Sequence, residues 1–139
     1  MERINWNDYF MNIAENIARR SPCLSLQIGA VITCDNKILS TGYNGVPKSV
    51  KHCTNCIKYS SHCFKAVHAE INAILQCNNV TINNESKLVL YTTLSPCIDC
   101  AKIILNTNIK TIYYKETYED NRTNAINYLK TNGIGVIKL

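Results

Sequence analysis

Two short motifs constrain the fold of this chain more than any other feature of its sequence. The first is His68-Ala69-Glu70, and the second is Pro96-Cys97-Ile98-Asp99-Cys100. The imidazole of His68 and the thiols of Cys97 and Cys100 are typical ligands of a catalytic zinc ion, which keeps its fourth position open for water. The fold must therefore bring two segments that are separate in the sequence to one point.

The residue types around these ligands indicate hydrolytic chemistry. Zinc lowers the pKa of bound water to about 7, and Glu70, too close to His68 to be an easy ligand, is well placed to shuttle protons. Pro96 suits the first turn of a helix. Cys97 and Cys100, three residues apart in that turn, would share one helix face, where free backbone N–H groups favour thiolates.

Each motif alone has an ordinary explanation. A single His-x-Glu usually belongs to a solvated helix face, and a single Cys-x-x-Cys occurs in redox pairs and in zinc-ribbon knuckles. Both motifs in this order, with Pro96 before the first cysteine and a helical pattern after each, favour a catalytic zinc site over a structural zinc or a redox pair.

Composition narrows the class of protein. At 139 residues we expect a single domain spanning 1–139, without a membrane span or an apolar signal-peptide core. These features predict a cytoplasmic protein, in which eight cysteines favour metal ligation over disulfides. The net charge of +5 suits a phosphorylated small molecule and does not by itself indicate a nucleic-acid groove.

Hydrophobic periodicity predicts alternating strands and helices, and therefore an α/β fold with a central sheet. The first two strands should form an antiparallel hairpin, and later strands should be parallel with helical crossovers. Both motifs then fall at helix N-termini beside strand ends, where open α/β sheets bind ligands. We expect helices over 6–19, 67–76, 97–106 and 121–131, strands over 27–34, 37–41, 87–92, 111–114 and 134–137, a tight loop over 42–45, and an ordered loop over 46–61.

With these motifs placed, the chain resembles the zinc-dependent cytidine deaminase superfamily, and more narrowly the deoxycytidylate (dCMP) deaminases. The resemblance runs from about residue 5 to residue 137, and Gly42-Tyr43-Asn44-Gly45 is the part that selects the dCMP deaminases. It implies a three-layer α/β/α fold with a five-stranded mixed sheet. The stretches that carry it are 28–32, 40–47, 68–75, 91–97 and 133–134.

The resemblance also implies an activity and its regulation. The reaction would be zinc-dependent deamination of dCMP to dUMP and ammonia, which supplies dUMP for dTTP synthesis. In that family dCTP with Mg²⁺ activates, dTTP inhibits, and the usual assembly is a hexamer. Glu70 would be the catalytic residue, and the Gly42, Tyr43, Asn44 and Gly45 loop would belong to the effector site. The implied substrate-binding residues are Asn44, Ala69, Ser95, Pro96, Lys65 and Tyr118.

One departure concerns the substrate phosphate. Many relatives carry Arg two residues after the cysteine that matches Cys23, whereas this chain has Ser25. Lys65, Arg19, Arg20 or a neighbouring subunit would then have to contact the phosphate. Some viral relatives accept both dCMP and dCTP, so a bifunctional enzyme is the alternative.

The remaining cysteine-rich segment suggests a second metal site. Some related dCMP deaminases bind a structural zinc, and a closed four-ligand site would stabilise a loop that has little core of its own. The set expected here is Cys23, Cys53, Cys56 and Cys63, with His62 or His52 as substitutes, and the alternative is a set of free thiols.

Two other functions remain open from the residues. A deaminase of bases in nucleic acid would need a basic, aromatic-lined surface, which the modest charge does not favour. A zinc-stabilised binding module without catalysis would explain the cysteine-rich loop, but it would not need the carboxylate of Glu70.

Overall fold

A computed structural model of the chain describes residues 1–56, 63–78, 80, 86–119 and 123–139. Helices and strands alternate after an initial hairpin, as the sequence pattern predicts. The helices are α1 (Trp6–Ala18), α2 (Ala69–Gln76), α3 (Ile98–Ile104) and α4 (Ala125–Thr131), and the strands are β1 (Gly29–Cys34), β2 (Lys37–Tyr43), β3 (Leu88–Leu94), β4 (Ile109–Glu116) and β5 (Gly135–Lys138).

The strands form one mixed sheet in the order β2-β1-β3-β4-β5. Strands β1 and β2 form an antiparallel hairpin, and β1 also pairs antiparallel with β3. Asp35 and Asn36 turn the hairpin with φ angles of 49° and 60°, as a type I′ turn requires. The pairs β3–β4 and β4–β5 are parallel, which confirms the mixed five-stranded sheet.

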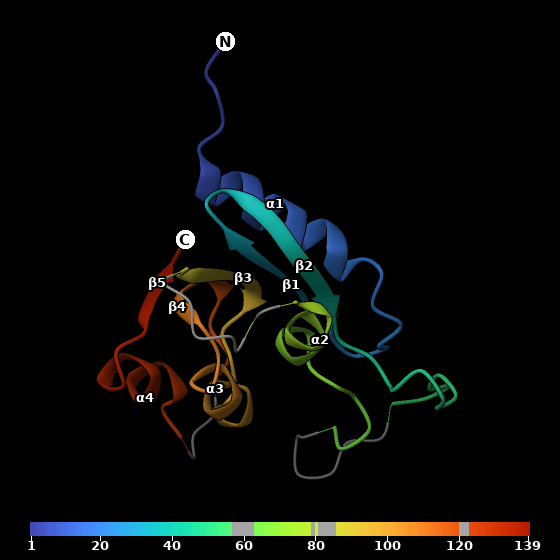
Figure 1. Cartoon of the computed structure of the whole chain (residues 1–139). Helices are drawn as coiled ribbons and strands as arrows, with labels where there is room; N and C mark the ends of the chain where they lie inside the picture. Colours follow the sequence, from blue (N-terminus) through green and yellow to red (C-terminus); the bar gives the residue numbers. More distant parts are fainter. Residues whose placement is uncertain (57–62, 79, 81–85, 120–122) are drawn as a thin grey trace.

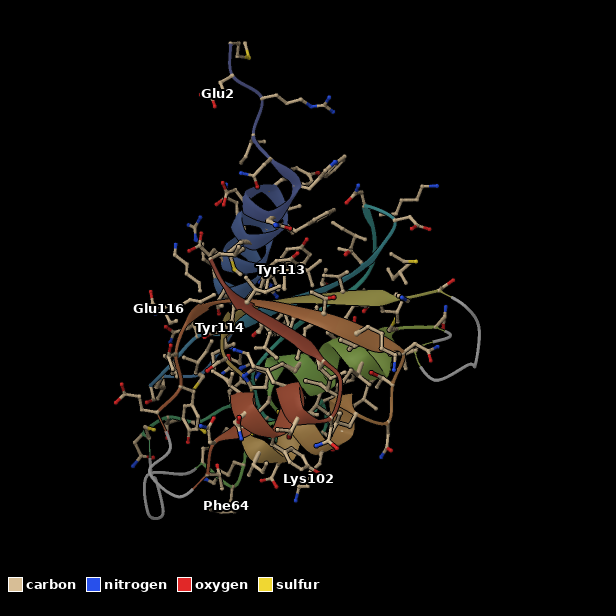
Figure 2. All side chains as sticks on the ribbon, turned by 90° about the vertical axis from the view of Figure 1, so that its left-hand side faces the viewer. Glu2, Phe64, Lys102, Tyr113, Tyr114 and Glu116 are labelled. Carbon is tan, nitrogen blue, oxygen red and sulfur yellow. The ribbon has the colours of Figure 1, made fainter. Side chains whose placement is uncertain are left out.

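Helices cover both faces of this sheet, so the predicted three-layer α/β/α arrangement is confirmed. Helix α1 lies on one face, and α2, α3 and α4 lie on the other (Figure 1). Two neighbouring residues of β4 pack against the helices on opposite faces of the sheet. Tyr114 belongs to the larger core under α2, α3 and α4, whereas Tyr113 packs on the smaller core beneath α1, and Figure 2 shows them on opposite sides of the strand.

The observed elements differ from the expected ones near the sheet edge. Gly42 and Tyr43 end strand β2 rather than forming a tight loop. Helix α2 begins at Ala69, not at residue 67, because Val67 pairs in an isolated bridge with Gly45. The expected helix over 121–131 is observed from Ala125, and residues 121 and 122 lie outside the described part.

Gly42 has a packing role at this edge. A Cβ atom there would lie 2.4 Å from both the Ala69 carbonyl oxygen and the Ala73 nitrogen. Its absence lets β2 lie directly against α2, the helix that follows His68. Among the described residues, no helix combines the length and apolar character needed to cross a lipid bilayer.

Candidate active site

The first motif is fixed at the start of helix α2. His68 is the residue before the helix, with an extended backbone, and it accepts the first helical hydrogen bond from Asn72 N at 3.0 Å. The preceding residue, Val67, exchanges two backbone hydrogen bonds with Gly45, of 3.1 and 2.8 Å. This bridge fixes the direction in which the chain enters α2, and with it the position of the His68 ring.

The second motif is fixed at the start of helix α3. Cys97 is the residue before the helix and accepts a backbone hydrogen bond from Ala101 at 2.9 Å. Cys100 lies within the first turn, as expected from the spacing. Because α3 follows β3 directly, both thiols lie at the carboxyl end of that strand, and Cys97 and Cys100 are both buried.

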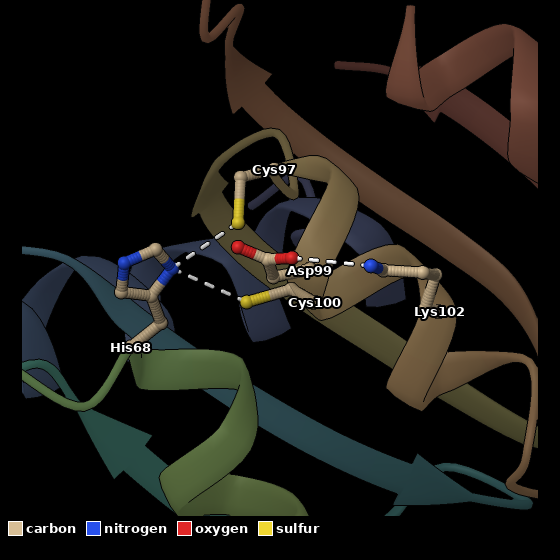
Figure 3. A network of polar contacts seen from close by, with 5 residues as sticks. All are labelled: His68, Cys97, Asp99, Cys100 and Lys102. Atoms are coloured by element: carbon tan, nitrogen blue, oxygen red, sulfur yellow. Dashed lines mark hydrogen bonds and ion pairs between the residues drawn. The ribbon is translucent and has the colours of Figure 1, made fainter. Parts of the chain in front are cut away.

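These two helix starts bring the three expected ligands together (Figure 3). His68 Nδ1 lies 3.2 Å from Cys100 Sγ and 3.4 Å from Cys97 Sγ, and the three ligand atoms lie within 4.8 Å of one another. Ligand atoms around a tetrahedral zinc are separated by about 3.6 to 3.8 Å. The donor types and their spacing therefore fit a zinc ion with little movement of the side chains. Among the described residues this is the only such group.

Asp99 does not join the group, although it lies between the two cysteines in the sequence. Its carboxylate pairs with Lys102 at 3.3 Å on the exposed side of α3 (Figure 3). Such an exposed pair contributes little to stability. Asp99 is therefore a surface residue of this turn.

Hydrogen bonds among these three side chains shift their pKa values. The hydrogen bond with Cys97 raises the pKa of His68 to about 9. The hydrogen bond from Cys100, together with the one from His68, lowers the pKa of Cys97 to about 4, whereas donation to Cys97 and burial raise the pKa of the Cys100 thiol. Zinc ligation requires a neutral imidazole and thiolates, so zinc uptake would release protons from His68 and Cys100.

Glu70 lies beside this group in the first turn of α2. It is 3% exposed, and burial raises the pKa of its carboxyl group. One carboxylate oxygen accepts a hydrogen bond from the Thr92 hydroxyl at 3.3 Å, and the other lies 3.7 Å from Cys100 Sγ. A carboxyl group with a raised pKa next to three ligands of the zinc type is suited to carry a proton during a reaction.

A cavity opens onto the group. Its volume is about 170 Å³, more than ten times the roughly 15 Å³ that one water molecule occupies by the same kind of measure. His68, Glu70 and Cys97 line one part of it. A ligand larger than water can therefore reach both the candidate metal group and the carboxylate.

Several of the expected substrate residues line the same cavity. Asn44, Lys65, Ser95 and Tyr118 do so. Ser95 is buried, and its hydroxyl accepts a hydrogen bond from Tyr118 N at 2.7 Å, which holds the segment after β4 against the turn before α3.

The other expected substrate and effector residues are placed differently. Ala69 is fully buried, and Pro96 lines a neighbouring pocket together with Tyr118. Gly45 lines the main cavity. Gly42 packs against α2, and Tyr43 accepts a hydrogen bond from Asn72 Nδ2 at its carbonyl oxygen, so these two positions join β2 to α2.

The cysteine-rich segment forms another part of the cavity. Cys23, His52, Cys53, Cys56 and Cys63 all line it, but they do not form a second group of the close spacing found for His68, Cys97 and Cys100 among the described residues. His62, a possible substitute ligand, lies outside the described residues. The segment thus contributes to the wall of the cavity.

Sequence reasoning missed two functional candidates, Thr92 and Ser21. Thr92 contacts Glu70 from the neighbouring strand β3, and Ser21 donates a hydrogen bond to the Asn44 carbonyl oxygen at 2.7 Å. The position of Thr92 at the end of the predicted strand over 87–92 was only a weak indication. Nothing in the local pattern singled out Ser21.

The family model for the cytidine and deoxycytidylate deaminase zinc-binding region matches residues 4–116. ComE operon protein 2 of Bacillus subtilis is 42% identical over 121 residues, which cover 86% of this chain and 64% of that protein. The deoxycytidylate deaminase of Mus musculus is 34% identical over 132 residues, which cover 84% of this chain and 68% of that protein.

Solved structures agree with these relatives. The dCMP deaminase from the cyanophage S-TIM5, in complex with dCMP and dUMP, matches with a TM-score of 0.79 and 28% sequence identity. The match covers 100% of both chains. The fold and the sequence therefore point to the same group of proteins.

Proposed function

Since the chain belongs to the cytidine and deoxycytidylate deaminase family, we propose that it deaminates dCMP hydrolytically to dUMP and ammonia with the help of zinc. The observation that carries the proposal is the buried carboxylate of Glu70 beside His68, Cys97 and Cys100 on the wall of a ligand-sized cavity. The names of the mouse and cyanophage relatives, and the dCMP and dUMP bound in the latter, support the choice of substrate.

His68, Cys97 and Cys100 would hold the zinc, which supplies a Lewis acid that lowers the pKa of water. The Glu70 carboxylate accepts the proton of the attacking water and delivers it to the ring nitrogen next to the reacting carbon. It then takes the second proton from the hydroxyl group added to the ring carbon and passes it to the exocyclic amine, so that a carbonyl group forms, the carbon–nitrogen bond breaks and ammonia leaves. The Thr92 hydroxyl helps to hold Glu70 in position for both transfers.

The substrate contacts follow the same proposal. Asn44 would bind the sugar, and Lys65, which lines the cavity, would contact the phosphate in place of the arginine that Ser25 replaces. Tyr118, held by Ser95, would contact the base from the side of α3, and Ala69 and Pro96 would complete the base site with backbone groups.

Regulation and assembly form a second part of the proposal. We propose that dCTP with Mg²⁺ activates the enzyme, that dTTP inhibits it, and that it assembles as a hexamer, on the strength of the Gly42-Tyr43-Asn44-Gly45 sequence. We also propose a second, structural zinc at Cys23, Cys53, Cys56 and Cys63, because all four line the same cavity. A cytoplasmic location is supported by eight cysteines that are all free thiols.

The test is ammonia release by zinc-loaded protein offered dCMP, dCTP, deoxycytidine and a cytosine-containing oligonucleotide. Each substrate is tested alone, with dCTP and Mg²⁺, and with dTTP. We expect turnover of dCMP that dCTP stimulates and dTTP suppresses. Turnover of dCTP itself would support the bifunctional alternative. Activity on the oligonucleotide alone, or zinc binding without any activity, would contradict the proposal.

A further inference from the structure

We infer that Ser21 is a positioning residue for the substrate cavity, because Ser21 and Asn44 together hold the irregular wall formed by residues 22–28. Ser21 contributes no atom to the cavity lining, but it helps to set the shape of the cavity. The effect of Ser21 on substrate binding rests on the proposed function.

The wall needs such support because it has no secondary structure of its own. Residues 22–28 connect α1 to β1 and contain no helix or strand. Pro22, Cys23, Leu24, Ser25, Leu26 and Ile28 nevertheless all line the cavity. Backbone groups of such a segment need partners from side chains or from other segments, since no regular ladder supplies them.

Asn44 supplies the partners at the far end of the wall. It is 6% exposed, and its amide oxygen accepts a hydrogen bond from Ile28 N at 2.8 Å while its amide nitrogen donates to the Leu26 carbonyl oxygen at 2.7 Å. Its own backbone N–H donates to the Ile28 carbonyl oxygen at 3.3 Å. The amide nitrogen carries a second hydrogen, so Asn44 can hold the wall and still offer one donor to a ligand.

Ser21 supplies the partners at the near end. Its hydroxyl donates to the Asn44 carbonyl oxygen at 2.7 Å and accepts a hydrogen bond from Cys23 N at 3.2 Å. Its own N–H donates to Ala18 at the end of α1, at 3.0 Å. Ser21 therefore connects α1, the start of the wall and Asn44 through three hydrogen bonds, and both ends of the wall depend on a single residue, Asn44.

Ser21 contacts the wall that would bind the substrate and does not contact the groups that would react with it. Glu70 and the three candidate zinc ligands lie on α2 and α3, or directly before them, and none of them is bonded to Ser21. Loss of the Ser21 hydroxyl should loosen the wall without moving the reacting groups. A less ordered wall must be ordered when the substrate binds, which lowers affinity. KM should then rise while kcat stays close to that of the wild type.

The test compares Ser21→Ala with Ser21→Thr, which keeps the hydroxyl, and with Ser49→Ala, which removes an exposed hydroxyl outside the cavity lining. Residue-resolved amide exchange by NMR is measured on the zinc-loaded proteins, followed by steady-state kinetics with dCMP. In Ser21→Ala we expect exchange at Cys23 N–H and at neighbouring wall amides to accelerate, and KM to rise, each by about fivefold to tenfold. The other two variants should resemble the wild type.

Two results would overturn the inference. One is wall exchange and KM within twofold of the wild type in Ser21→Ala. The other is a fall in kcat without a change in KM, which would place Ser21 in the chemistry. If Ser21→Ala does not fold, the wild-type chain provides the test, because saturating dUMP should slow exchange at Cys23 and Ile28.

The same measurement separates this inference from the proposed function. If dUMP slows exchange at Val67 and His68 but leaves residues 22–28 unchanged, the wall inference is wrong and the nucleotide site stands. If dUMP changes no amide around the cavity and the wild type releases no ammonia from dCMP, the proposed function is wrong. Acceleration of wall exchange in Ser21→Ala would then still support the structural role of Ser21.

Discussion

Thr92 and Glu70 face each other across the boundary between strand β3 and helix α2. The single hydrogen of the Thr92 hydroxyl is shared between the Leu94 carbonyl oxygen at 2.8 Å and Glu70 Oε1 at 3.3 Å, and Thr92 is fully buried. A buried carboxylate with few donors depends strongly on each of them. The strand therefore fixes the orientation of a carboxylate that belongs to a different element.

Replacement of Thr92 should test this orientation. Thr92→Val keeps the shape of the side chain and removes the donor, so we expect kcat to fall by about tenfold, the cost of one hydrogen bond to a charged group. Zinc content should not change. Thr41→Val, at a half-buried position of β2, serves as the control and should keep wild-type kcat. Equal rates for both variants would show that Glu70 is held by its other contacts.

Glu70 itself should be needed for the reaction but not for the metal. Glu70→Gln keeps the size of the side chain and removes its ability to transfer protons. We expect kcat to fall by about 10³-fold or more, with zinc content and melting temperature close to those of the wild type. Glu116→Gln, an exposed change at the end of β4, is the matched control. Retention of activity in Glu70→Gln would favour a binding module without catalysis.

The zinc ligands should be separable from the other cysteines by metal analysis. Cys97→Ser or Cys100→Ser removes one ligand of the close group, so we expect loss of the tightly bound zinc, of activity and of the stability that the ion contributes. Cys77→Ser, a buried cysteine at the end of α2, should keep its zinc. One zinc per wild-type chain, unchanged by Cys53→Ser, would exclude the second site.

Tyr91 should make stability depend on pH in the alkaline range. Its hydroxyl donates to Asn7 at 2.8 Å, and burial, with a further contribution from Tyr113, raises its pKa to about 12. An unfolded tyrosine has a pKa of about 10. The folded chain holds this proton more tightly, so its contribution is fully present below about pH 10 and is lost as pH rises towards 12. Urea unfolding across this range should show a shallower decline for Tyr91→Phe than for the wild type.

Gly42, in strand β2, should tolerate a side chain poorly. Gly42→Ala forces a methyl group against the backbone of α2, and such overpacking costs about 1–3 kcal/mol or more. Gly135→Ala is the matched control, because its added methyl group would meet its nearest neighbours at an ordinary 3.8 Å. Urea midpoints should fall clearly for Gly42→Ala only. A modest drop in kcat/KM should accompany the loss of stability in Gly42→Ala, since α2 carries Glu70.

Much of the fold was predictable because its determinants are local. Three determinants each act within a few positions: the β-branched and aromatic residues of 111–114, the turn residues Asp35 and Asn36, and Pro96 before a helical pattern. The start of α2 was predicted less well. Val67 pairs with Gly45, a residue far away in the chain, and this bridge replaces the first helical turn that the pattern favoured.

The sequence by itself determined the chemistry of the site, because His68, Glu70, Cys97 and Cys100 are each defined by residue type and by spacing within one motif. Only the tertiary structure decided which residues support them. The pairing of Thr92 with Ala30 in the sheet places β1, and the wall before it, next to β3, and the hairpin then brings Asn44 to that wall. Such contacts depend on strand order and register, which short-range patterns do not encode.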